Sequence, residues 1–265
     1  MSKKLVLLDM DGTIYLGDHL FNGVHECFDY FKKHDINFVF ITNNSSHDLE
    51  FYENKMTRMG IKCNRSNFYS SIEVTLEYLK KKNAKKIFVL GNECLKKKLE
   101  NYFEITSSFD ENTKIDAVVC GFNTELVYED LKNASLYLQT LDCEFLATNG
   151  DYRCPIEDGL YIPDCGGMIE WLRLCTNKTA RVLGKPDPEI INQLIKKFNV
   201  LPSEVICVGD RLYTDIKVAV NAGVDSVCVL SGESTLEDIN NYESKPTYII
   251  DSIKDLPSLL EKIHS

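Results

Sequence analysis

The sequence lacks several features that would place the protein in a well-defined class. It has no run of about 20 apolar residues, the length that a membrane-spanning helix needs. It has no surplus of positive charge, because the formal net charge of its 265 residues is −10. This balance argues against nucleic acid or an anionic membrane as a partner. Neither a G-x-x-x-x-G-K-[ST] loop nor a G-x-G-x-x-G turn occurs, so nucleotide-binding kinases and dehydrogenases are not expected.

Paired cysteines and a leader segment are also missing. The ten cysteines stand singly, and no C-x-x-C pair occurs, so zinc and redox sites are not expected. Buried thiols in a reducing compartment fit this pattern. The first chemical motif follows Met1 within a few residues and leaves no room for a signal peptide. We therefore expect a cytoplasmic protein.

Two carboxylates follow the first apolar run. Leu5–Leu8 reads as a strand buried on both faces, and Asp9 and Asp11 come directly after it. In an extended chain these two side chains project to the same side, and like charges that close need a cation or a shared proton. Mg²⁺ prefers oxygen ligands and is commonly held by one or two carboxylates. The same pattern also occurs in ordinary turns, but a calcium loop is excluded because Ile14 and the residues after it supply no further oxygen ligands.

Polar residues follow two further apolar runs in the same way. Thr42 and Asn43 come after the run 38–41, and Asp210 comes after the run 205–208. Between them, Lys185 stands in the short motif Gly-Lys-Pro. Ligands of open parallel sheets bind outside the carboxyl ends of the strands, so these side chains are predicted to converge with the first two aspartates.

The order of the predicted elements indicates an α/β protein with an inserted domain. Strands and helices alternate up to residue 80, and a basic stretch at 80–86 marks a boundary. A second alternation fills residues 81–180, including a turn-rich loop at 149–167 and a helix at 168–175 that buries Trp171. The first pattern resumes at 181, with a helix from Pro186 to Phe198. We predict a Rossmann-like doubly wound parallel sheet made of residues 1–80 and 181–265, and a smaller α/β cap made of residues 81–180.

Four motifs, in order, resemble those of the haloacid dehalogenase superfamily, a group of mostly Mg²⁺-dependent phosphatases. They are DMDGT (9–13), ITNN (41–44), GKP (184–186) and GDRLYTD (209–215). The insertion is similar to the α/β cap of the 4-nitrophenylphosphatase-like branch, which includes phosphoglycolate, pyridoxal phosphate and nucleotide phosphatases. That branch tends to show Asn-Pro-Asp and Pro-Gly-x-Gly where this chain has Gly150 and Asp164, and these departures bear on the substrate.

The resemblance implies a role in the chemistry for four residues. Asp9 corresponds to the nucleophile, which a carboxylate can be without a separate base. Asp11 corresponds to the general acid and base, which protonates the leaving group and activates water. Lys185 corresponds to the lysine that neutralises developing charge, and Thr42 to the residue that holds the phosphate.

The resemblance also implies a magnesium site and a substrate site. The metal ligands are Asp9, Asp11 through its backbone carbonyl, Asp210 and Asp215, of which Asp215 is either a ligand or a residue that orients the loop. Some of these residues have a structural interpretation as well. Thr42 and Asn43 could instead cap the next helix, and Arg211 could form a salt bridge within its loop. Asp151 could be a turn residue. The residues expected to bind substrate are Thr42, Asn43, Asn44, Lys185, Arg211 and Asp151.

The sequence therefore predicts a Mg²⁺-dependent phosphatase of small phosphomonoesters that works through an aspartyl-phosphate. Sugar phosphates, nucleotides, phosphoglycolate and 4-nitrophenyl phosphate are the substrate types considered. Two alternatives stay open: a phosphotransferase or mutase with the same intermediate, and a phosphate-binding regulator without catalysis. The expected partner is a small phosphorylated metabolite, with neither nucleic acid nor a membrane, and relatives with this cap often form homodimers through it.

Overall fold

The computed structural model describes residues 2–45, 47–155 and 160–264, and the chain forms two compact units. Unit 1 consists of Met1–Thr42, Leu49–Tyr69 and Lys185–Ser265, and unit 2 consists of Asn43–Asp48 and Ser70–Gly184. The chain thus leaves unit 1 for unit 2 twice. The interpretation of residues 1–80 and 181–265 as a catalytic core, and of 81–180 as a cap, stays a prediction.

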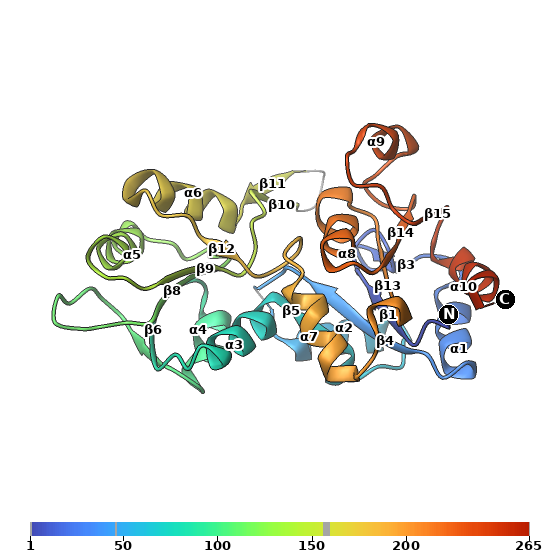
Figure 1. Cartoon of the computed structure of the whole chain (residues 1–265), viewed down its shortest axis with the longest axis horizontal. Coiled ribbons are helices and arrows are strands. Elements are labelled where there is room, and N and C mark those ends of the chain that lie inside the picture. The colour runs from blue at the N-terminus through green and yellow to red at the C-terminus, as the bar shows by residue number, and fades with distance from the viewer. Residues whose placement is uncertain (1, 46, 156–159, 265) are drawn as a thin grey trace. The chain divides into compact units, whose positions relative to one another are not determined.

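Unit 1 is built on a six-stranded sheet with the strand order β15-β14-β13-β1-β4-β5. The strands are β1 (Leu5–Leu8), β4 (Asn37–Thr42), β5 (Phe68–Ser70), β13 (Val205–Gly209), β14 (Asp225–Val229) and β15 (Tyr248–Ile250). β1 pairs in parallel with β4 and with β13, which lies beside it although it is far away in the sequence (Figure 1). The carboxyl ends of these strands, where the polar motifs stand, therefore meet at one edge.

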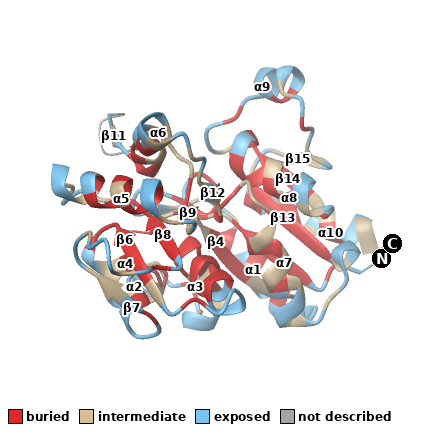
Figure 2. Cartoon of the chain, turned by 60° about the vertical axis from the view of Figure 1, so that its left-hand side comes forward, coloured by how far each residue is buried: buried red, intermediate tan, exposed pale blue. Residues whose placement is uncertain are grey.

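The apolar runs explain why these strands lie at the centre. All four residues of β1 are 0% exposed, and every residue of β13 is buried. Strands covered on both faces have this composition, and Figure 2 shows the buried strands flanked by helices with exposed outer faces. The helices of unit 1 are α1 (Val24–Lys33), α2 (Leu49–Arg58), α7 (Glu189–Phe198), α8 (Lys217–Ala222), α9 (Leu236–Asn241) and α10 (Leu256–His264). The α/β fold class is confirmed.

Short elements complete unit 1. A hairpin of β2 (Tyr15–Leu16) and β3 (His19–Leu20) follows the first motif. A turn of π-helix, η4 (Leu212–Ile216), precedes α8. Single 3-10 turns are η1 (Arg65–Asn67), η3 (Pro202–Glu204) and η5 (Ile253–Asp255).

The helix predicted to start at Pro186 starts later. α7 begins at Glu189, and Pro188 is its N-cap. The residue before a proline is disfavoured in helical geometry, so Asp187 cannot continue a helix into Pro188. The prediction was wrong because it took the first of two closely spaced prolines as the start.

Unit 2 has its own five-stranded sheet, with the strand order β12-β9-β8-β6-β7 and parallel pairing throughout. Its core contains apolar side chains such as Phe88, Val118, Tyr137 and Leu172. The strands are β6 (Lys86–Leu90), β7 (Glu104–Thr106), β8 (Ala117–Cys120), β9 (Glu144–Ala147) and β12 (Arg181–Val182). The helices are α3 (Ser71–Lys81), α4 (Glu93–Glu100), α5 (Tyr128–Thr140) and α6 (Cys165–Thr176).

The segment 149–167 is more ordered than the predicted loop. β10 (Arg153–Pro155) and β11 (Tyr161–Pro163) pair as an antiparallel hairpin, and residues 156–159 lie outside the described chain. α6 begins three residues before the predicted start, at Cys165, because Asp164 caps it. The prediction that Trp171 is buried was wrong: its side chain is 63% exposed, while Met168 and Leu172 occupy the buried face of α6.

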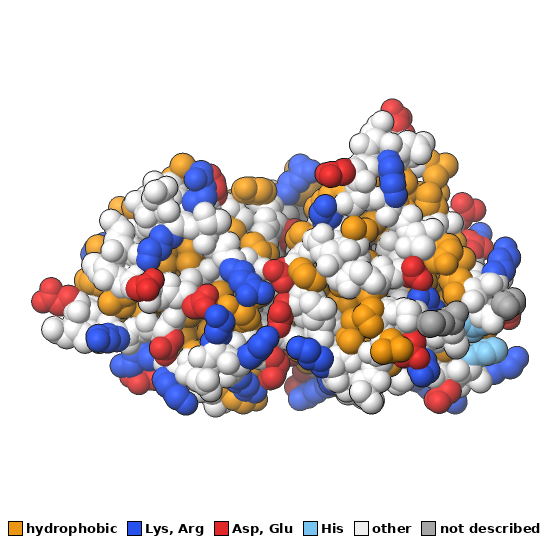
Figure 3. Space-filling view, viewed as in Figure 1, with side chains coloured by type: hydrophobic (Ala, Val, Ile, Leu, Met, Phe, Trp, Pro, Cys, Tyr) orange, Lys and Arg blue, Asp and Glu red, His pale blue; other side chains and the backbone are white. Residues whose placement is uncertain are grey.

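Figure 3 shows the charged side chains on one face of the molecule. In the view of Figure 3, acidic and basic side chains are interspersed. Among the described helices, none is both long enough and apolar enough to cross a bilayer. The expectation of buried thiols holds for half of the cysteines, namely Cys27, Cys120, Cys165, Cys207 and Cys228, whereas Cys175 is exposed.

Candidate active site

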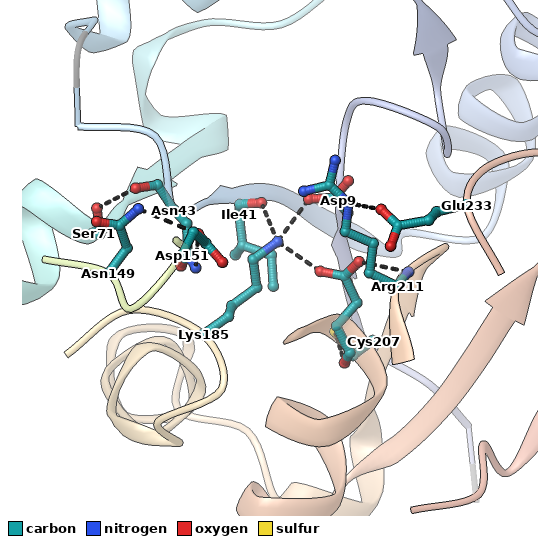
Figure 4. A network of polar contacts seen from close by, with 11 residues as sticks. Asp9, Ile41, Asn43, Ser71, Asn149, Asp151, Lys185, Cys207, Arg211 and Glu233 are labelled. Atoms are coloured by element: carbon teal, nitrogen blue, oxygen red, sulfur yellow. Dashed lines mark hydrogen bonds and ion pairs between the residues drawn. The ribbon is translucent and has the colours of Figure 1, made fainter. Parts of the chain in front are cut away.

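Asp9 and Lys185 form the first contact of the candidate site. Asp9 follows β1, and its backbone N–H donates to the carbonyl of Val208 at 2.9 Å, which fixes it beside the end of β13. The Nζ of Lys185 lies 2.6 Å from Oδ1 of Asp9 and 3.4 Å from the carbonyl oxygen of Ile41 at the end of β4 (Figure 4). The lysine is only 4% exposed, so its charge is directed into the site.

Three carboxylates gather at the same edge of the sheet. Asp9, Asp210 and Asp215 each offer one oxygen, and these oxygens lie within 4.8 Å of one another. Asp210 follows β13 directly and is 2% exposed. One of its oxygens accepts a hydrogen bond from the N–H of Glu233 at 2.8 Å. Its other oxygen, Oδ1, is buried without a hydrogen-bond partner among the described residues.

These groups fit a hard divalent cation such as Mg²⁺. The donor atoms are all carboxylate oxygens, and a buried oxygen without a partner is costly unless a cation or water satisfies it. Two glycines keep the space around Asp210 open, because a Cβ on Gly12 or on Gly232 would overlap its carboxylate. Gly12 also has a φ of +82°, which side-chain-bearing residues rarely adopt.

Burial, and after it the neighbouring negative charge, raises the pKa values of Asp9 and Asp210 when no cation is present. Burial, then the charge of Asp215, raises the pKa of Asp9 to about 8, although Lys185 partly offsets both effects. Burial and Asp215 raise the pKa of Asp210 to about 6. Burial opposes the charge of Lys185, but Asp215 and Asp9 outweigh it and raise the pKa of this lysine above its usual range. The raised pKa values mean that the carboxylates bind positive charge, either a proton or a cation, favourably near pH 7.

Asp215 has both oxygens occupied. Oδ1 lies 2.6 Å from Nζ of Lys185, and Oδ2 accepts the backbone N–H of Arg211 at 3.1 Å. The residue is 1% exposed and lies in η4. The two bonds hold the carboxylate of Asp215 between the lysine and the loop, and its role as metal ligand or orienting residue stays a prediction.

Arg211 forms a salt bridge, which was one of the two roles predicted for it from the sequence. Its Nε lies 3.0 Å from Oε2 of Glu233. Burial disfavours its charge, but the nearby Asp9, Tyr213 and Asp210 raise the pKa of the guanidinium. The field of the carboxylate cluster thus reaches Arg211 as well.

Asp11 lies outside the carboxylate cluster. Asp11 is one of the exposed residues of the first motif. Loss of solvation raises the pKa of Asp11, and Lys55 and Arg211 lower it by a smaller amount. Asp11 and Asp9 therefore have unlike surroundings, which the proposed division into acid and nucleophile requires.

The predicted substrate residues fall into two units. Thr42 ends β4 in unit 1, while Asn43 and Asn44 belong to unit 2. Because α2 begins only at Leu49, Thr42 and Asn43 are too far from it to cap it.

Asp151 of unit 2 is more than a turn residue. Its Oδ2 accepts hydrogen bonds from the amides of Asn43, at 3.0 Å, and of Asn149, at 3.2 Å (Figure 4). The amide of Asn149 also donates to Asp164 at 3.2 Å, and the hydroxyl of Ser71 donates to the carbonyl of Asn43 at 2.8 Å. This group orders the start of the segment after β9.

Several residues of the site were not found from the sequence. Ser231 donates to the carbonyl of Gly12 at 2.9 Å, and Glu233 contacts Asp210 and Arg211. Both follow β14, the strand next to β13, so the rule about strand ends applies to them too. Tyr15 and Lys55 carry no such signal.

Comparisons with known proteins place the chain in a family. A family model described as haloacid dehalogenase-like hydrolase matches residues 6–103, and a second, HAD-hydrolase-like, matches residues 182–256. An acid sugar phosphatase of Staphylococcus haemolyticus is 31% identical over 260 residues, which is 98% of this chain and 97% of that protein.

Solved structures agree with this result over nearly the whole chain. A 4-nitrophenylphosphatase of Thermotoga maritima is 37% identical with a TM-score of 0.88, covering 97% of each chain. NagD of E. coli K-12 is 28% identical with a TM-score of 0.87, covering 96% of this chain and 98% of that one. A glycerol phosphate phosphatase of Mycobacterium tuberculosis, solved with magnesium, is 26% identical with a TM-score of 0.87, covering 98% of this chain and 78% of that one. The chain therefore belongs to the haloacid dehalogenase superfamily, in its 4-nitrophenylphosphatase-like branch of phosphoric monoester hydrolases.

Proposed function

We propose that this protein is a Mg²⁺-dependent phosphatase that hydrolyses small phosphomonoesters by way of a phosphoryl group carried on Asp9. The observation that carries the proposal is the contact of Lys185 with Asp9 at 2.6 Å, beside two further buried carboxylates. A carboxylate, a cation and an oxygen-only ligand cluster at the ends of parallel strands are the parts that phosphoryl transfer needs.

In the first step, a carboxylate oxygen of Asp9 attacks phosphorus. The Asp9–phosphorus bond forms as the bond from phosphorus to the alcohol oxygen breaks. Asp11 donates its proton to the departing oxygen, so the alcohol leaves neutral. General acid help of this kind contributes about 10²–10⁴-fold to a rate.

In the second step, water hydrolyses the bond between Asp9 and phosphorus. Asp11, now ionised, accepts a proton from the water as the water oxygen attacks phosphorus. The bond between Asp9 and phosphorus breaks, and inorganic phosphate is released. Both aspartates then return to their starting state, with Asp11 protonated and Asp9 ionised.

Lys185 and the metal site supply positive charge for this chemistry. Its raised pKa keeps Lys185 protonated at neutral pH, next to the nucleophile. Mg²⁺ would be held by Asp9, Asp210 and the backbone carbonyl of Asp11, with Asp215 orienting Lys185. When bound, the ion neutralises negative charge on the phosphate and keeps Asp9 ionised.

Unit 2 is proposed as the cap that selects the substrate. Thr42, Asn43 and Asn44 are proposed to hold the phosphate, together with Lys185. Asp151 and Arg211 are proposed to contact the rest of the substrate. The names of the relatives, acid sugar phosphatase and glycerol phosphate phosphatase, favour sugar and polyol phosphates, with 4-nitrophenyl phosphate as a convenient substitute. A homodimer through the cap and a cytoplasmic location stay predictions.

The test is release of phosphate from a panel of sugar phosphates, glycerol phosphate, phosphoglycolate, nucleotides and 4-nitrophenyl phosphate. Phosphate should appear in step with substrate loss in MgCl₂ and stop in EDTA. Substrate loss without equal phosphate release, in the presence of an alcohol acceptor, would indicate a phosphotransferase. Tight binding of phosphate esters without turnover of any would indicate a regulator.

A further inference from the structure

The loop after β14 contacts both chain segments that carry proposed metal ligands. It consists of Ser231, Gly232 and Glu233, here called the β14 loop, and it belongs to unit 1. Gly12 lies in the motif after β1, and Asp210 follows β13. The strand order β14-β13-β1 puts the first motif two strands away from the β14 loop. The contact of the loop with Gly12 therefore reaches past the end of β13.

The carboxylate of Asp210 is enclosed at one oxygen and open at the other. Its Oδ2 accepts the backbone N–H of Glu233 at 2.8 Å, and a Cβ on Gly232 would overlap the same oxygen. The terminal torsion of a carboxylate is broad unless a contact holds it, and this N–H does so. The other oxygen, Oδ1, is buried and has no hydrogen-bond partner among the described residues. The β14 loop thus occupies Oδ2 and leaves Oδ1 for a cation.

Gly12 is held at both of its peptide groups. Its N–H donates to the carbonyl of Tyr15 at 2.8 Å, and its carbonyl accepts the hydroxyl of Ser231 at 2.9 Å. The N–H of Gly12 and the carbonyl of Asp11 belong to one planar peptide unit, so the first of these bonds also orients that carbonyl. The carbonyl of Asp11 is the proposed backbone ligand of the cation. Ser231 therefore restrains the segment that carries it.

The β14 loop is itself anchored on both sides. Before it, the N–H of Leu230 donates to the carbonyl of Ile250 in β15 at 3.1 Å. At its end, Oε2 of Glu233 lies 3.0 Å from Nε of Arg211 (Figure 4) and accepts the hydroxyl of Tyr213 at 3.3 Å. An anchored loop that contacts two ligand segments fixes their spacing.

We propose that the β14 loop positions the ligands of the cation and thereby sets the affinity and the selectivity of the site for Mg²⁺. The inference rests on the proposed function, in which Asp210 and the carbonyl of Asp11 bind Mg²⁺. Mg²⁺ demands a near-ideal arrangement of its ligands, whereas Ca²⁺ accepts a flexible one. Loss of the positioning contacts should therefore weaken the binding of Mg²⁺ more than the binding of Ca²⁺.

The test measures Kd for Mg²⁺ and for Ca²⁺ by calorimetry in the full-length protein, with the chloride salts alone and no substrate. Gly232→Ala forces the carboxylate of Asp210 to move, and the backbone of Gly232 lies outside the left-handed region, so alanine adds no strain there. We expect Kd for Mg²⁺ to rise about 10- to 100-fold, the range for residues that orient metal ligands. Kd for Ca²⁺ should rise at most about threefold.

Ser231 provides a variant without steric overlap. Ser231→Ala removes the hydrogen bond to Gly12 and should raise Kd for Mg²⁺ about tenfold. Ser231→Thr keeps the hydroxyl and should return this Kd to within about threefold of wild type. Phosphate release by Ser231→Ala should need more MgCl₂ for its half-maximal rate, while kcat at saturating MgCl₂ stays within about threefold.

Two controls make the same kinds of change in unit 2. A Cβ on Gly167 would meet nothing within 4 Å. The half-buried Thr176 donates its hydroxyl to the carbonyl of Leu172 at 2.7 Å. Gly167→Ala and Thr176→Ala should leave both Kd values unchanged. Melting temperatures in EDTA compare the cation-free fold of each variant with that of its control.

Two results would overturn the inference while leaving the proposed function standing. One is an active wild type whose Kd for Mg²⁺ is the same in Gly232→Ala and in Ser231→Ala. The other is an equal rise of Kd for both cations in these variants, which would indicate loss of structure and not of positioning. A wild type that binds Mg²⁺ but releases no phosphate refutes the proposed function alone, and one that binds no Mg²⁺ refutes both.

Discussion

Lys185 and Asp215 form a buried ion pair, with 2.6 Å between Nζ and Oδ1 and with 4% and 1% of their side chains exposed. Burial of two charges costs solvation, so such a pair is not a source of stability in itself. Its value here is positional. Because Asp215 holds the lysine on one side, the same Nζ is presented to Asp9 at 2.6 Å on the other.

The first prediction concerns this pair. Asp215→Asn leaves Lys185 buried with Asp9 as its remaining close carboxylate, and breaking a buried pair costs about 3–5 kcal/mol. We expect the free energy of unfolding to fall by about that amount and kcat to fall at least about 10²-fold, as the lysine loses its orientation. Urea titration followed by circular dichroism measures the first effect, and phosphate release measures the second.

The control for that experiment is an exposed pair. Lys132 lies 3.0 Å from Glu129 on α5, and both side chains are at least half exposed. Lys132→Met should change the free energy of unfolding by less than about 1 kcal/mol. An Asp215→Asn variant as stable and as active as the Lys132→Met variant would contradict the positional role.

The second prediction concerns the nucleophile. In Asp9→Asn an amide replaces the attacking carboxylate, so turnover should fall below about one thousandth of wild type. The fold should be kept, because the raised pKa of Asp9, about 8, means that the cation-free protein already tolerates a neutral group there. Phosphate release and circular dichroism test the two parts. Asp18→Asn, at an exposed position of the hairpin turn, is the control that should retain activity.

The sequence predicted the central part of this fold because the signal there is strong. Apolar runs such as Leu5–Leu8 indicate buried strands, and parallel pairing then brings the residues after them to one edge. Asp9 and Asp210 come together for that reason. The second alternation of strands and helices likewise predicted further strands in residues 81–180. The strands β6 to β9 lie there and belong to one sheet.

Other features have no local signal in the sequence. The contact of Lys55 with Tyr15 joins two segments through side-chain packing, which no motif spacing reveals. The hairpin of β10 and β11 has strands of three residues among turn-forming residues, too short for an alternating pattern to emerge. Trp171 follows the helical period of α6, but the period alone does not say which face the protein buries.

The third prediction links pH to metal binding. The pKa of Asp9 is about 8 in the folded, cation-free protein against an ordinary value of 3.8, so between these values the folded state binds a proton that the unfolded state does not. By linkage, this group makes the cation-free protein less stable as pH rises from about 4 to 8. Mg²⁺ must displace that proton, so its affinity should increase from pH 6 to pH 8.

Thermal unfolding with EDTA and with MgCl₂ at several pH values measures this linkage. The increase in melting temperature caused by Mg²⁺ should be larger at pH 8 than at pH 6. Calorimetry in buffers of different ionisation enthalpy should detect proton release on Mg²⁺ binding at pH 7. In Asp9→Asn both effects should shrink, and an Mg²⁺ effect that is the same at all pH values would count against the assignment.

The fourth prediction concerns Asp151 and the selection of substrate. Its Oδ2 accepts hydrogen bonds from the side-chain amides of Asn43 and Asn149. Asp151→Asn replaces one carboxylate oxygen by an NH₂ group, which is itself a donor and cannot accept from these amides. If unit 2 reads the alcohol part of the substrate through this residue, KM for the preferred sugar or polyol phosphate should rise about tenfold. The kcat for 4-nitrophenyl phosphate should stay within about threefold, because Asp151 is not assigned to the chemistry. Asp142→Asn, an exposed acid of the same unit, removes an equal charge and should change neither value. A KM that rises equally for every phosphate ester would instead indicate that Asp151 acts only by holding Asn43 in the phosphate site, because all of the esters share the phosphate.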